Sequence, residues 1–460
     1  MGVSSVSLAD LRRVPAVPGL PYIGSLFDMQ RDPLGFGLRV AQEFGDVARM
    51  KVMGEEGIVL HSPQDIQHVL QTNSRNYSKQ TMDYQLLRPL VGNGLLTSDG
   101  DFWLRQRRLM QPAFHRQRIA ALADMMVEAT LAALETWEPA IQRGEAIALD
   151  QEMARLTLTI VGRALLSFDL GDEANEFGRA FRQANAHFGF KNFLSLLLPQ
   201  LPTRSNRQFK QAVRSMDAVV QEIIATRRRQ GAAAAPDDLL SLLMEAVDEE
   251  TGEGMTDQQL RDEVMTILLA GHETTANALT WTFYLLSQHP EEAERLYAEV
   301  DQVLAGRPPT FDDLPRLTFA RYVFQEALRL YPPAWSIARR SIEADMLGGY
   351  AIPGGTIVHI NIYVLHHNPR YWEEPERFWP DRFDEAHSEG RHRFAFIPFS
   401  AGPRKCIGDQ FAMTEGLLIL ATVVQRLALD LAPGHRVEPH PLITLTPKYG
   451  MRMIPRRRTA

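Results

Sequence analysis

The chain has 460 residues, of which 45% are apolar and 23% are charged. This composition supports a large hydrophobic core and argues against a disordered chain. The 49 basic and 56 acidic residues give a net charge of −7, which argues against a nucleic-acid-binding protein. The single cysteine excludes an intrachain disulfide and indicates a reducing compartment.

Targeting and membrane-spanning patterns are not recognised in the sequence. The segment Met1–Arg13 lacks the apolar stretch of a signal peptide. The longest apolar runs, Phe193–Leu201 and Leu417–Val424, fall short of the roughly 18 residues that a membrane-spanning helix needs. We therefore expect a cytoplasmic protein without a membrane anchor.

In chain order, the predicted elements change from strands to helices. Prolines and glycines punctuate an extended arm over residues 15–24, and Val47–Leu60 has the alternating, glycine-interrupted pattern of a hairpin. Helical periodicity dominates from Phe102 to Leu330. We expect one domain over residues 1–460, with a β-rich portion at about residues 15–65 followed by a helical body.

One predicted helix is much longer than the others. It runs over Asp257–Gln288, with Thr256 as its N-cap, and would be roughly 48 Å long. Such a helix can cross a whole domain. Farther on, Gly348–Val358 resembles a turn-rich strand pair and Leu442–Ile454 a terminal hairpin. The expected fold is mainly α with small β-sheets toward the two chain ends.

The only cysteine, Cys406, follows a loop rich in glycine and proline and precedes the apolar helical pattern of Asp409–Leu427. A lone cysteine is most often a small buried side chain. Here the positive end of the following helix and the neighbouring Arg404 and Lys405 favour a thiolate. A nucleophilic thiol remains an alternative, because a partner histidine could come from a distant part of the chain.

This loop resembles the haem-binding segment of the cytochrome P450 superfamily, Phe-x-x-Gly-x-Arg-x-Cys-x-Gly. Phe399, Gly402, Arg404, Cys406 and Gly408 match every fixed position. The resemblance implies the cytochrome P450 fold and a haem-thiolate monooxygenase of the soluble bacterial type. It also implies that Cys406 is the axial ligand of the iron of haem b and that Arg404 reaches a haem propionate. A thiolate ligand favours cleavage of the O–O bond.

A second motif, Ala270–Thr275, lies in the middle of the long helix. It could be ordinary buried sequence, since hydroxyls within helices usually bond to their own backbone. A functional interpretation has Ala270 and Gly271 leaving room above the haem while Thr274 diverts the Ala270 carbonyl. The motif resembles the distal (Ala/Gly)-Gly-x-(Asp/Glu)-Thr-(Thr/Ser) pattern of the family. By that resemblance, Glu273 and Thr274 are the catalytic acid–alcohol pair that delivers protons.

Glu326 and Arg329 are three residues apart on one predicted helix face, a spacing that is usually a solvated ion pair. Their apolar neighbours suggest burial instead. The pair resembles the Glu-x-x-Arg motif of the family, with Arg382 as the expected third member. The resemblance implies a structural role for these three residues.

Trp103 and Arg107 lie one helical turn apart and can face the same ligand. They resemble the Trp-x-x-x-Arg motif of the family, which contacts a propionate. Arg340 is the predicted third propionate ligand, with Arg339 as the rival candidate. His366 could approach the haem edge, although a surface position is the commoner interpretation.

The substrate side of the site is less clearly marked. Each apolar candidate could equally belong to the core, but together they indicate a lipophilic small-molecule substrate. The candidate pocket residues are Leu96, Phe188, Phe190, Leu268 and Ile337.

The sequence contains no flavin or dinucleotide fingerprint and no cysteine set for an iron–sulfur cluster. We expect a monomer that receives electrons from a separate ferredoxin or flavodoxin reductase system and uses O2. One group of basic residues could form the face that binds this partner, or could equally be an ordinary solvated charged face. These residues are Arg105, Arg108, Arg116, Arg118 and Lys405.

Two other functions are compatible with parts of the sequence. A peroxide-driven peroxygenase or an isomerase on the same fold would retain the haem, but such members tend to lose the acid–alcohol pair that Glu273 and Thr274 retain. A non-haem helical binding protein would require all four motif matches to be coincidental. The monooxygenase hypothesis therefore leads.

Overall fold

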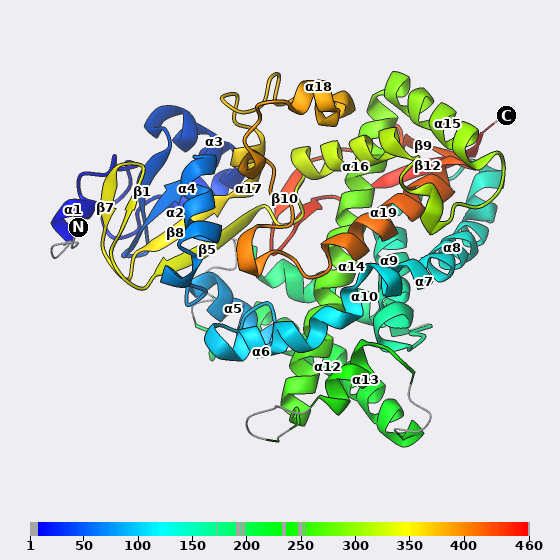
Figure 1. The fold of residues 1–460 in the computed structure, drawn as a ribbon, viewed down its shortest axis with the longest axis horizontal. Coiled ribbons are helices and arrows are strands. Elements are labelled where there is room, and N and C mark those ends of the chain that lie inside the picture. Colours follow the sequence, from blue (N-terminus) through cyan, green and yellow to red (C-terminus); the bar gives the residue numbers. More distant parts are fainter. Residues whose placement is uncertain are drawn as a thin grey trace.

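The computed structural model describes residues 8–171, 173–189, 195, 198–231, 236–246, 252 and 254–458. Figure 1 shows a β-sheet module beside a larger helical body, with the N-terminal end of the chain at the outer edge of the sheet module. The predicted fold class, mainly helical with small sheets, is confirmed. Within the described part of the chain, no helix is both long enough and apolar enough to cross a bilayer.

The predicted N-terminal hairpin is present. Strands β1 (Val47–Val52) and β2 (Glu55–Leu60) pair antiparallel. Met53 and Gly54, the two residues between them, both have positive φ, 52° and 84°. Two such residues make the tight turn whose twist matches that of paired strands.

The hairpin belongs to a five-stranded sheet of order β1-β2-β8-β5-β3. Strand β8 (Ile357–Asn361) runs parallel to β2, whereas β5 (Ser336–Ser341) and β3 (Tyr77–Ser78) continue the sheet antiparallel. The predicted pairing within Gly348–Val358 is therefore wrong. Strand β7 (Tyr350–Ile352) pairs with β6 (Asp345–Leu347), and β8 pairs with strands from elsewhere in the chain.

The C-terminal hairpin also differs from the prediction. Strand β11 (Leu445–Pro447) turns back on β10 (Pro439–Pro441), and β12 (Arg452–Arg457) joins β9 (Leu427–Leu431) and β4 (Ile147–Ala148). The local pattern marks the extended segments, but pairing between distant strands depends on the tertiary fold.

Helix α14 (Asp257–Gln288) is the long helix that the sequence predicts, with the same bounds. Thr256 and Gln259 form a reciprocal capping box at its start. The helix packs against α9 (Leu149–Leu166), α12 (Arg204–Gln230), α16 (Thr318–Leu330) and α19 (Asp409–Val424). It is therefore enclosed on most sides, as its buried residues on every face indicate.

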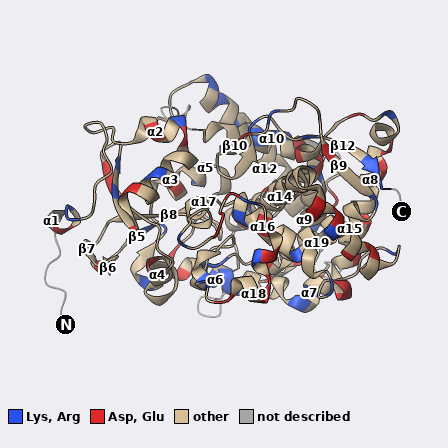
Figure 2. Cartoon of the chain, turned by 90° about the horizontal axis from the view of Figure 1, so that it is seen from above, with Lys and Arg blue, Asp and Glu red and all other residues tan. Residues whose placement is uncertain are grey.

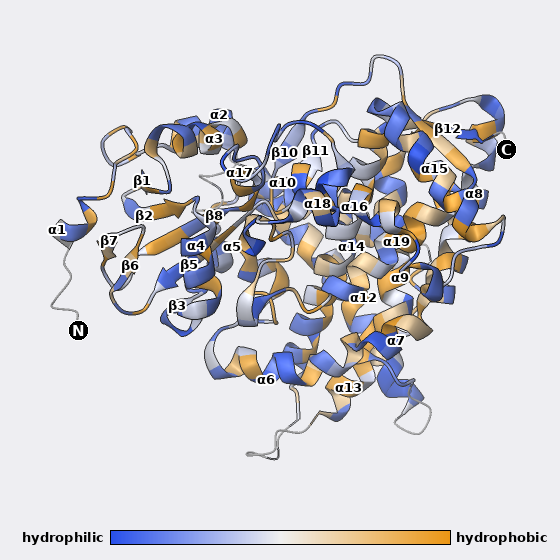
Figure 3. Ribbon diagram, turned by 45° about the horizontal axis from the view of Figure 1, so that its top comes forward, coloured by the Kyte–Doolittle hydropathy of each residue, from blue (hydrophilic) through white to orange (hydrophobic). Residues whose placement is uncertain are grey.

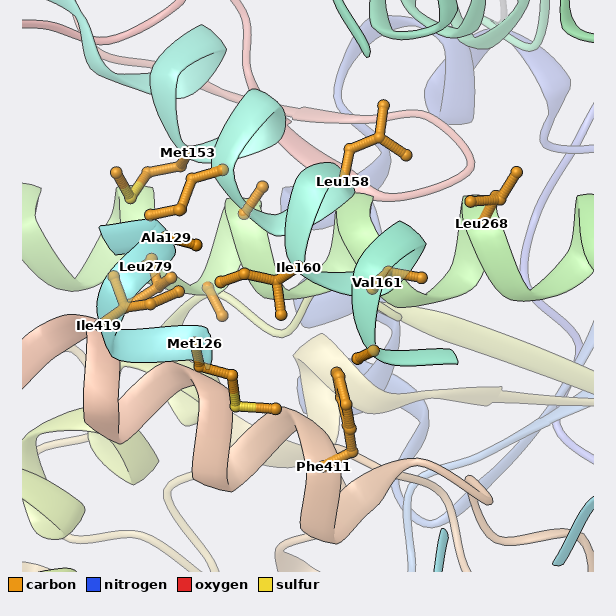
Figure 4. Packing of buried hydrophobic residues seen from close by; sticks show 14 of the residues in the cluster. Met126, Ala129, Met153, Leu158, Ile160, Val161, Leu268, Leu279, Phe411 and Ile419 are labelled. Atoms are coloured by element: carbon orange, nitrogen blue, oxygen red, sulfur yellow. The ribbon is translucent and has the colours of Figure 1, made fainter. Parts of the chain in front are cut away.

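The core is apolar and close-packed where these helices meet. Figure 4 shows side chains of α8 (Ala123–Arg143), α9, α14 and α19 interdigitating, among them Met126, Ile160, Leu279 and Phe411. In Figure 3, hydrophobic residues concentrate along the sheet strands and on the inner sides of the helices. A second cluster, which includes Ile58 and Val358, forms the core of the sheet module.

The other α-helices of the described residues surround this frame. They are α1 (Leu8–Leu11), α2 (Leu26–Arg31), α3 (Pro33–Phe44), α4 (Pro63–Gln67), α5 (Met82–Val91), α6 (Gly100–Met110), α7 (Arg116–Ala121), α10 (Glu173–His187), α13 (Leu239–Glu245), α15 (Pro290–Leu304), α17 (Ile362–His366) and α18 (Glu385–Ser388).

A buried ion-pair network joins α16 to the chain that follows the sheet. Glu326 accepts hydrogen bonds from Arg329 at 2.7 and 2.8 Å and from Arg382 at 2.8 Å. Arg329 also donates to the carbonyls of His366 and Pro375 at 2.8 and 2.7 Å. All three charged side chains are buried. One carboxylate thus organises two guanidiniums, and these in turn hold carbonyls of the segment that leads toward Cys406.

Replacing Glu326 by alanine leaves two buried guanidiniums without their carboxylate. We expect Glu326→Ala to lower the free energy of unfolding by about 3–5 kcal/mol, measured by urea denaturation. The matched control is Glu145→Ala, which removes the exposed pair with Arg143 and should cost less than about 1 kcal/mol. Equal effects of the two variants would show that the network contributes no more than a surface pair.

Candidate active site

The loop that carries Cys406 is shaped by backbone constraints. Gly402 has φ +69°, and a Cβ there would collide with the Leu70 carbonyl oxygen, so only glycine fits. The Cys406 N–H donates to the Phe399 carbonyl at 3.0 Å. Helix α19 starts at Asp409, directly after Gly408. The loop therefore places the sulfur just before the N-terminus of a buried helix.

The thiol of Cys406 is accessible and lies among charges of both signs. Desolvation by the surrounding protein raises its pKa, and the Gly408 N–H, Arg107 and Lys405 oppose that rise. Cys406 has accessible surface and yet is strongly desolvated by the surrounding protein. Its sulfur therefore lines an internal space. A sulfur that is accessible from inside the protein and faces an N–H group and cations has the surroundings of a metal-ligating thiolate.

A group of cations lies close to this loop with too few anions to match it. Lys79 and Arg339 are buried and Arg404 is largely so. Asp99 pairs with Arg404 and acts to raise the pKa of Lys79, whereas Arg339 has no carboxylate partner within the described residues. Burial, followed by the charges of Arg339 and Arg404, holds the pKa of Lys79 well below its usual range. Arg339 also donates to the Tyr84 hydroxyl at 3.1 Å. Among the described residues, three cations thus meet one carboxylate.

Trp103 and Arg107, on α6, lie where the motif predicts. The Arg404 guanidinium is 4.0 Å from the centre of the Trp103 ring, and that of Arg107 is 5.9 Å from it. Arg107 donates to the Lys405 carbonyl at 2.8 Å, which joins α6 to the cysteine loop. The two predicted residues are therefore gathered with Arg404 on one side of the loop.

Arg340, the favoured third propionate ligand, lies elsewhere. Its guanidinium donates to the carbonyls of Gln80 and Gly355 and pairs with Glu55 at 2.8 Å. Successive residues of a strand point to opposite faces, so Arg339 is the one that lies with Lys79 and Arg404. The structure thus favours the rival candidate.

These surroundings fit a dianionic cofactor held by a thiolate. Two positive charges without carboxylate partners are costly inside a protein unless an anion joins them. The two propionates of haem supply that charge, and arginines bind carboxylates well. The accessible sulfur of Cys406 lies on the same loop as Arg404. His366 does not join this group: its ring accepts a hydrogen bond from Ile397 N–H at 3.0 Å.

On α14, Ala270 is exposed although Leu269 is buried and Gly271 half-buried, so this side of the helix borders an internal space. The Thr274 hydroxyl donates to the Ala270 carbonyl at 2.8 Å, as the spacing predicts. Gly271 differs from the expectation. A Cβ there would meet Val161 of α9 at 2.9 Å, so this glycine permits close helix packing.

Glu273 is buried beside Thr274 but is held by other residues. Its Oε1 accepts from Asn277 Nδ2 and from the Thr444 hydroxyl, both at 3.2 Å. Burial raises the pKa of Glu273, and His272, whose Nε2 lies 3.9 Å from Oε2, has a pKa lowered by burial to about 4. The acid is therefore protonated over a wider pH range than an ordinary glutamate.

The comparisons with known proteins agree with this geometry. The family model described as "Cytochrome P450" matches residues 15–453. The chain belongs to the cytochrome P450 family. It is 38% identical to cyclooctatin synthase of Streptomyces melanosporofaciens over 97% of this chain and 96% of the relative.

Two further relatives are similar over nearly their full length. Cyclooctat-9-en-7-ol 5-monooxygenase of Streptomyces melanosporofaciens is 37% identical, covering 91% of this chain and 90% of the relative. Pentalenene oxygenase of Streptomyces avermitilis is 35% identical, covering 93% and 94%. This cytochrome P450 therefore matches monooxygenases along the whole domain and not only at its motifs.

The predicted pocket residues of this cytochrome P450 lie in different surroundings. Leu96 and Ile337 are half-buried, and Phe188 packs edge-on against Phe209. Leu268 is fully buried in the core (Figure 4), so it is not an open wall of a cavity. Phe190 lies outside the described residues.

Two acids that the sequence analysis missed hold the loop at residues 92–98 onto α14. Asp262 accepts from the Asn93 N–H at 2.8 Å and Glu263 from the Leu95 N–H at 3.0 Å. Desolvation, with a smaller contribution from Asp262, raises the pKa of Glu263 to about 7. The adjacent charges in Arg261-Asp-Glu263, within an otherwise apolar helix, were the available signal.

The predicted basic face is partly neutralised. Arg118 pairs with Asp237 at 2.8 Å and Lys405 pairs with Asp409, whereas Arg108 is exposed without an ion pair within the described residues. Figure 2 shows basic and acidic residues interspersed over the molecule, including around α6 and α7.

The placement of the two adjacent arginines leads to a test of haem binding. We expect Arg339→Leu to accelerate transfer of haem to apomyoglobin at least about tenfold, since it removes a buried charge-assisted contact to a carboxylate. Arg340→Leu, which removes only the contacts to Gln80, Gly355 and Glu55, should change the rate less than about twofold. Faster haem transfer from Arg340→Leu than from Arg339→Leu would show that Arg340 is the residue that binds the propionate.

The raised pKa of Glu263 predicts a pH-dependent stability. Between its ordinary value of 4.5 and about 7, the carboxyl ionises in the unfolded chain but stays protonated in the folded one. The contribution of Glu263 to the free energy of unfolding is therefore fully present below about pH 4.5 and is lost as the pH rises to about 7. Glu263→Gln should abolish this fall, gaining up to about 3 kcal/mol over the native chain between pH 5 and 8. Urea denaturation of both chains at pH 5 and at pH 8 measures this gain. If the two chains differ in free energy of unfolding by the same amount at both pH values, the raised pKa of Glu263 is contradicted.

Proposed function

We propose that this cytochrome P450 inserts one oxygen atom from O2 into a lipophilic terpenoid, by hydroxylation or epoxidation. The unmatched buried charge of Lys79, Arg339 and Arg404 beside an accessible Cys406 carries the proposal, because an anionic cofactor held by a thiolate accounts for both. The names of two relatives specify terpenoid substrates, cyclooctat-9-en-7-ol and pentalenene. That similarity supports the substrate class.

In the proposed holoenzyme, haem b would be held by groups on three separate segments. Cys406 would bind the iron through its sulfur, and Arg404, Arg339 and Lys79 would receive the propionates. Trp103 lies beneath the Arg404 guanidinium, which restricts the directions in which that guanidinium can point. Phe399 accepts the Cys406 N–H and orients the thiolate.

Bound haem supplies the capacity to bind O2 and to accept electrons for its reduction. The chain supplies position and protons. Ala270 keeps the distal side open, because any larger side chain at this exposed position would occupy the space. Thr274 presents its hydroxyl there, anchored to the Ala270 carbonyl. Glu273, one residue away and protonated over a wide pH range, is the proton source that recharges this hydroxyl.

Electrons come from a separate redox protein in this proposal. The candidate contacts for an acidic ferredoxin or flavodoxin are the exposed Arg108 of α6 and Arg116 of α7. Helix α6 is joined to the cysteine loop by Arg107, and α7 packs against α19. Arg118 and Lys405 already have acidic partners within the chain, so they contribute less.

The activity is tested with reconstituted holoenzyme, a ferredoxin system and a panel of cyclic terpenes. We expect the reduced enzyme with carbon monoxide to show the strongly red-shifted Soret band of thiolate ligation, and a terpene to shift the spin state and gain one oxygen. Thr274→Ala should keep the band while the product formed per electron falls about tenfold or more, since general acid catalysis contributes at least about that factor.

Cys406→Ala is the control for ligation and should lose the band. A band typical of histidine ligation in the native chain would overturn the haem-thiolate assignment. Unchanged coupling in Thr274→Ala would overturn the role of the hydroxyl. A second panel of non-terpenoid lipophilic compounds tests the substrate class, which would be overturned if members of that panel were oxidised and none of the terpenes was.

A further inference from the structure

The turn at residues 442–445, between β10 and β11, is attached to several elements around the distal side. Ile443 N–H donates to the Asn185 side chain of α10 at 3.2 Å. The Trp335 indole donates to the Leu442 carbonyl at 2.9 Å, and the Trp281 indole of α14 donates to the Leu445 carbonyl at 3.1 Å. The turn therefore has a defined position relative to α14.

At the centre of this turn, Thr444 is buried and reaches Glu273. Asn277, one helical turn beyond Glu273, donates from Nδ2 to Glu273 Oε1 at 3.2 Å and contacts Thr444 Oγ1 at 3.1 Å. The Thr444 hydroxyl donates to the same Oε1 at 3.2 Å. Two donors thus converge on one oxygen of the carboxyl group.

Hydrogen bonds from Asn277 and Thr444 oppose the rise that burial causes in the pKa of Glu273, so burial is what favours its protonated form. When the acid is protonated, the oxygen that accepts two hydrogen bonds has little room for the proton, which then lies on the other oxygen. We propose that Thr444 and Asn277 are positioning residues that keep the proton of Glu273 on Oε2 and orient that atom for delivery to the Thr274 hydroxyl. This inference rests on the proposed function, in which Glu273 is the proton source. It makes the C-terminal turn part of the proton-delivery apparatus, although the turn lies about 170 residues away in the chain.

The other groups that face Glu273 act on its charge but do not form hydrogen bonds with its carboxyl group within the described residues. His272, on the same helix, lies near Oε2 but is neutral, since burial lowers its pKa to about 4. Arg182 on α10 favours the ionised acid and Asp150 on α9 the protonated one. Thr444 and Asn277 are the hydrogen-bond partners of the carboxyl group within the described residues.

The test replaces Thr444 by valine, which keeps the shape and removes the hydroxyl, in the holoenzyme with its redox system and an oxidised terpene. We expect the product formed per electron to fall about three- to tenfold, the factor that one neutral hydrogen bond supports. The solvent deuterium isotope effect on turnover should rise and the pH profile should shift, whereas the carbon monoxide band should stay intact.

Thr444→Ser, which retains a donor, should restore native coupling. Thr446→Val is the matched control, because it removes a hydroxyl of the same hairpin that donates to the His440 carbonyl instead, and it should behave as the native enzyme. Asn277→Leu removes the second donor to Oε1 and should reproduce the effect if Thr444→Val folds poorly.

Glu273→Gln distinguishes the role of Glu273 as the proton source from the positioning role of Thr444 and Asn277. If it uncouples turnover while Thr444→Val and Asn277→Leu leave coupling and isotope effect native, the positioning role is wrong and the proton source stands. Native coupling in Glu273→Gln itself would overturn the proposed proton source, and the positioning role with it. Equal losses in Thr444→Val, Thr444→Ser and Thr446→Val would also overturn the inference, because they would reflect a general disturbance of the hairpin.

Discussion

Buried charge must be matched, and this constraint governs the architecture of the protein. Lys79, Arg339 and Arg404 come from three distant segments and converge beside the cysteine loop, where Asp99 pairs with Arg404 and acts on Lys79. A second set, around Glu326, is fully matched within the chain. The first set therefore suits the anionic cofactor that we propose, whereas the second joins two parts of the chain. The difference lies in the charge balance, because both sets are rich in arginine.

Helix α14 shows how one element can serve several purposes. Successive residues of a helix point about 100° apart, so neighbours in the sequence meet different surroundings. Ala270 borders the internal space, Gly271 packs against α9, and Glu273 turns toward the C-terminal hairpin. Near its N-terminal end, Asp262 and Glu263 hold the loop at residues 92–98. The loop at residues 92–98, Glu273 and the C-terminal hairpin are thus all held against one helix.

The cost of this arrangement is a set of buried acids. The pKa values of Glu263 and Glu273 are raised chiefly by desolvation, so both acids retain protons that a surface glutamate would lose. At Glu273 the raised pKa suits the proton-donor role that we propose for this residue. At Glu263 the same shift lowers stability at neutral pH, in exchange for a fixed loop.

Local pattern was enough to predict the bounds of α14, the hairpin β1–β2 and the cysteine loop, because capping, turn and glycine signals act within a few residues. The motif residues pointed to the family. The folded chain was needed to show which strands pair, that Arg339 rather than Arg340 joins the cation cluster, and that Thr444 reaches Glu273. These contacts join residues far apart in the chain, and their geometry depends on how whole elements pack, which no local pattern encodes.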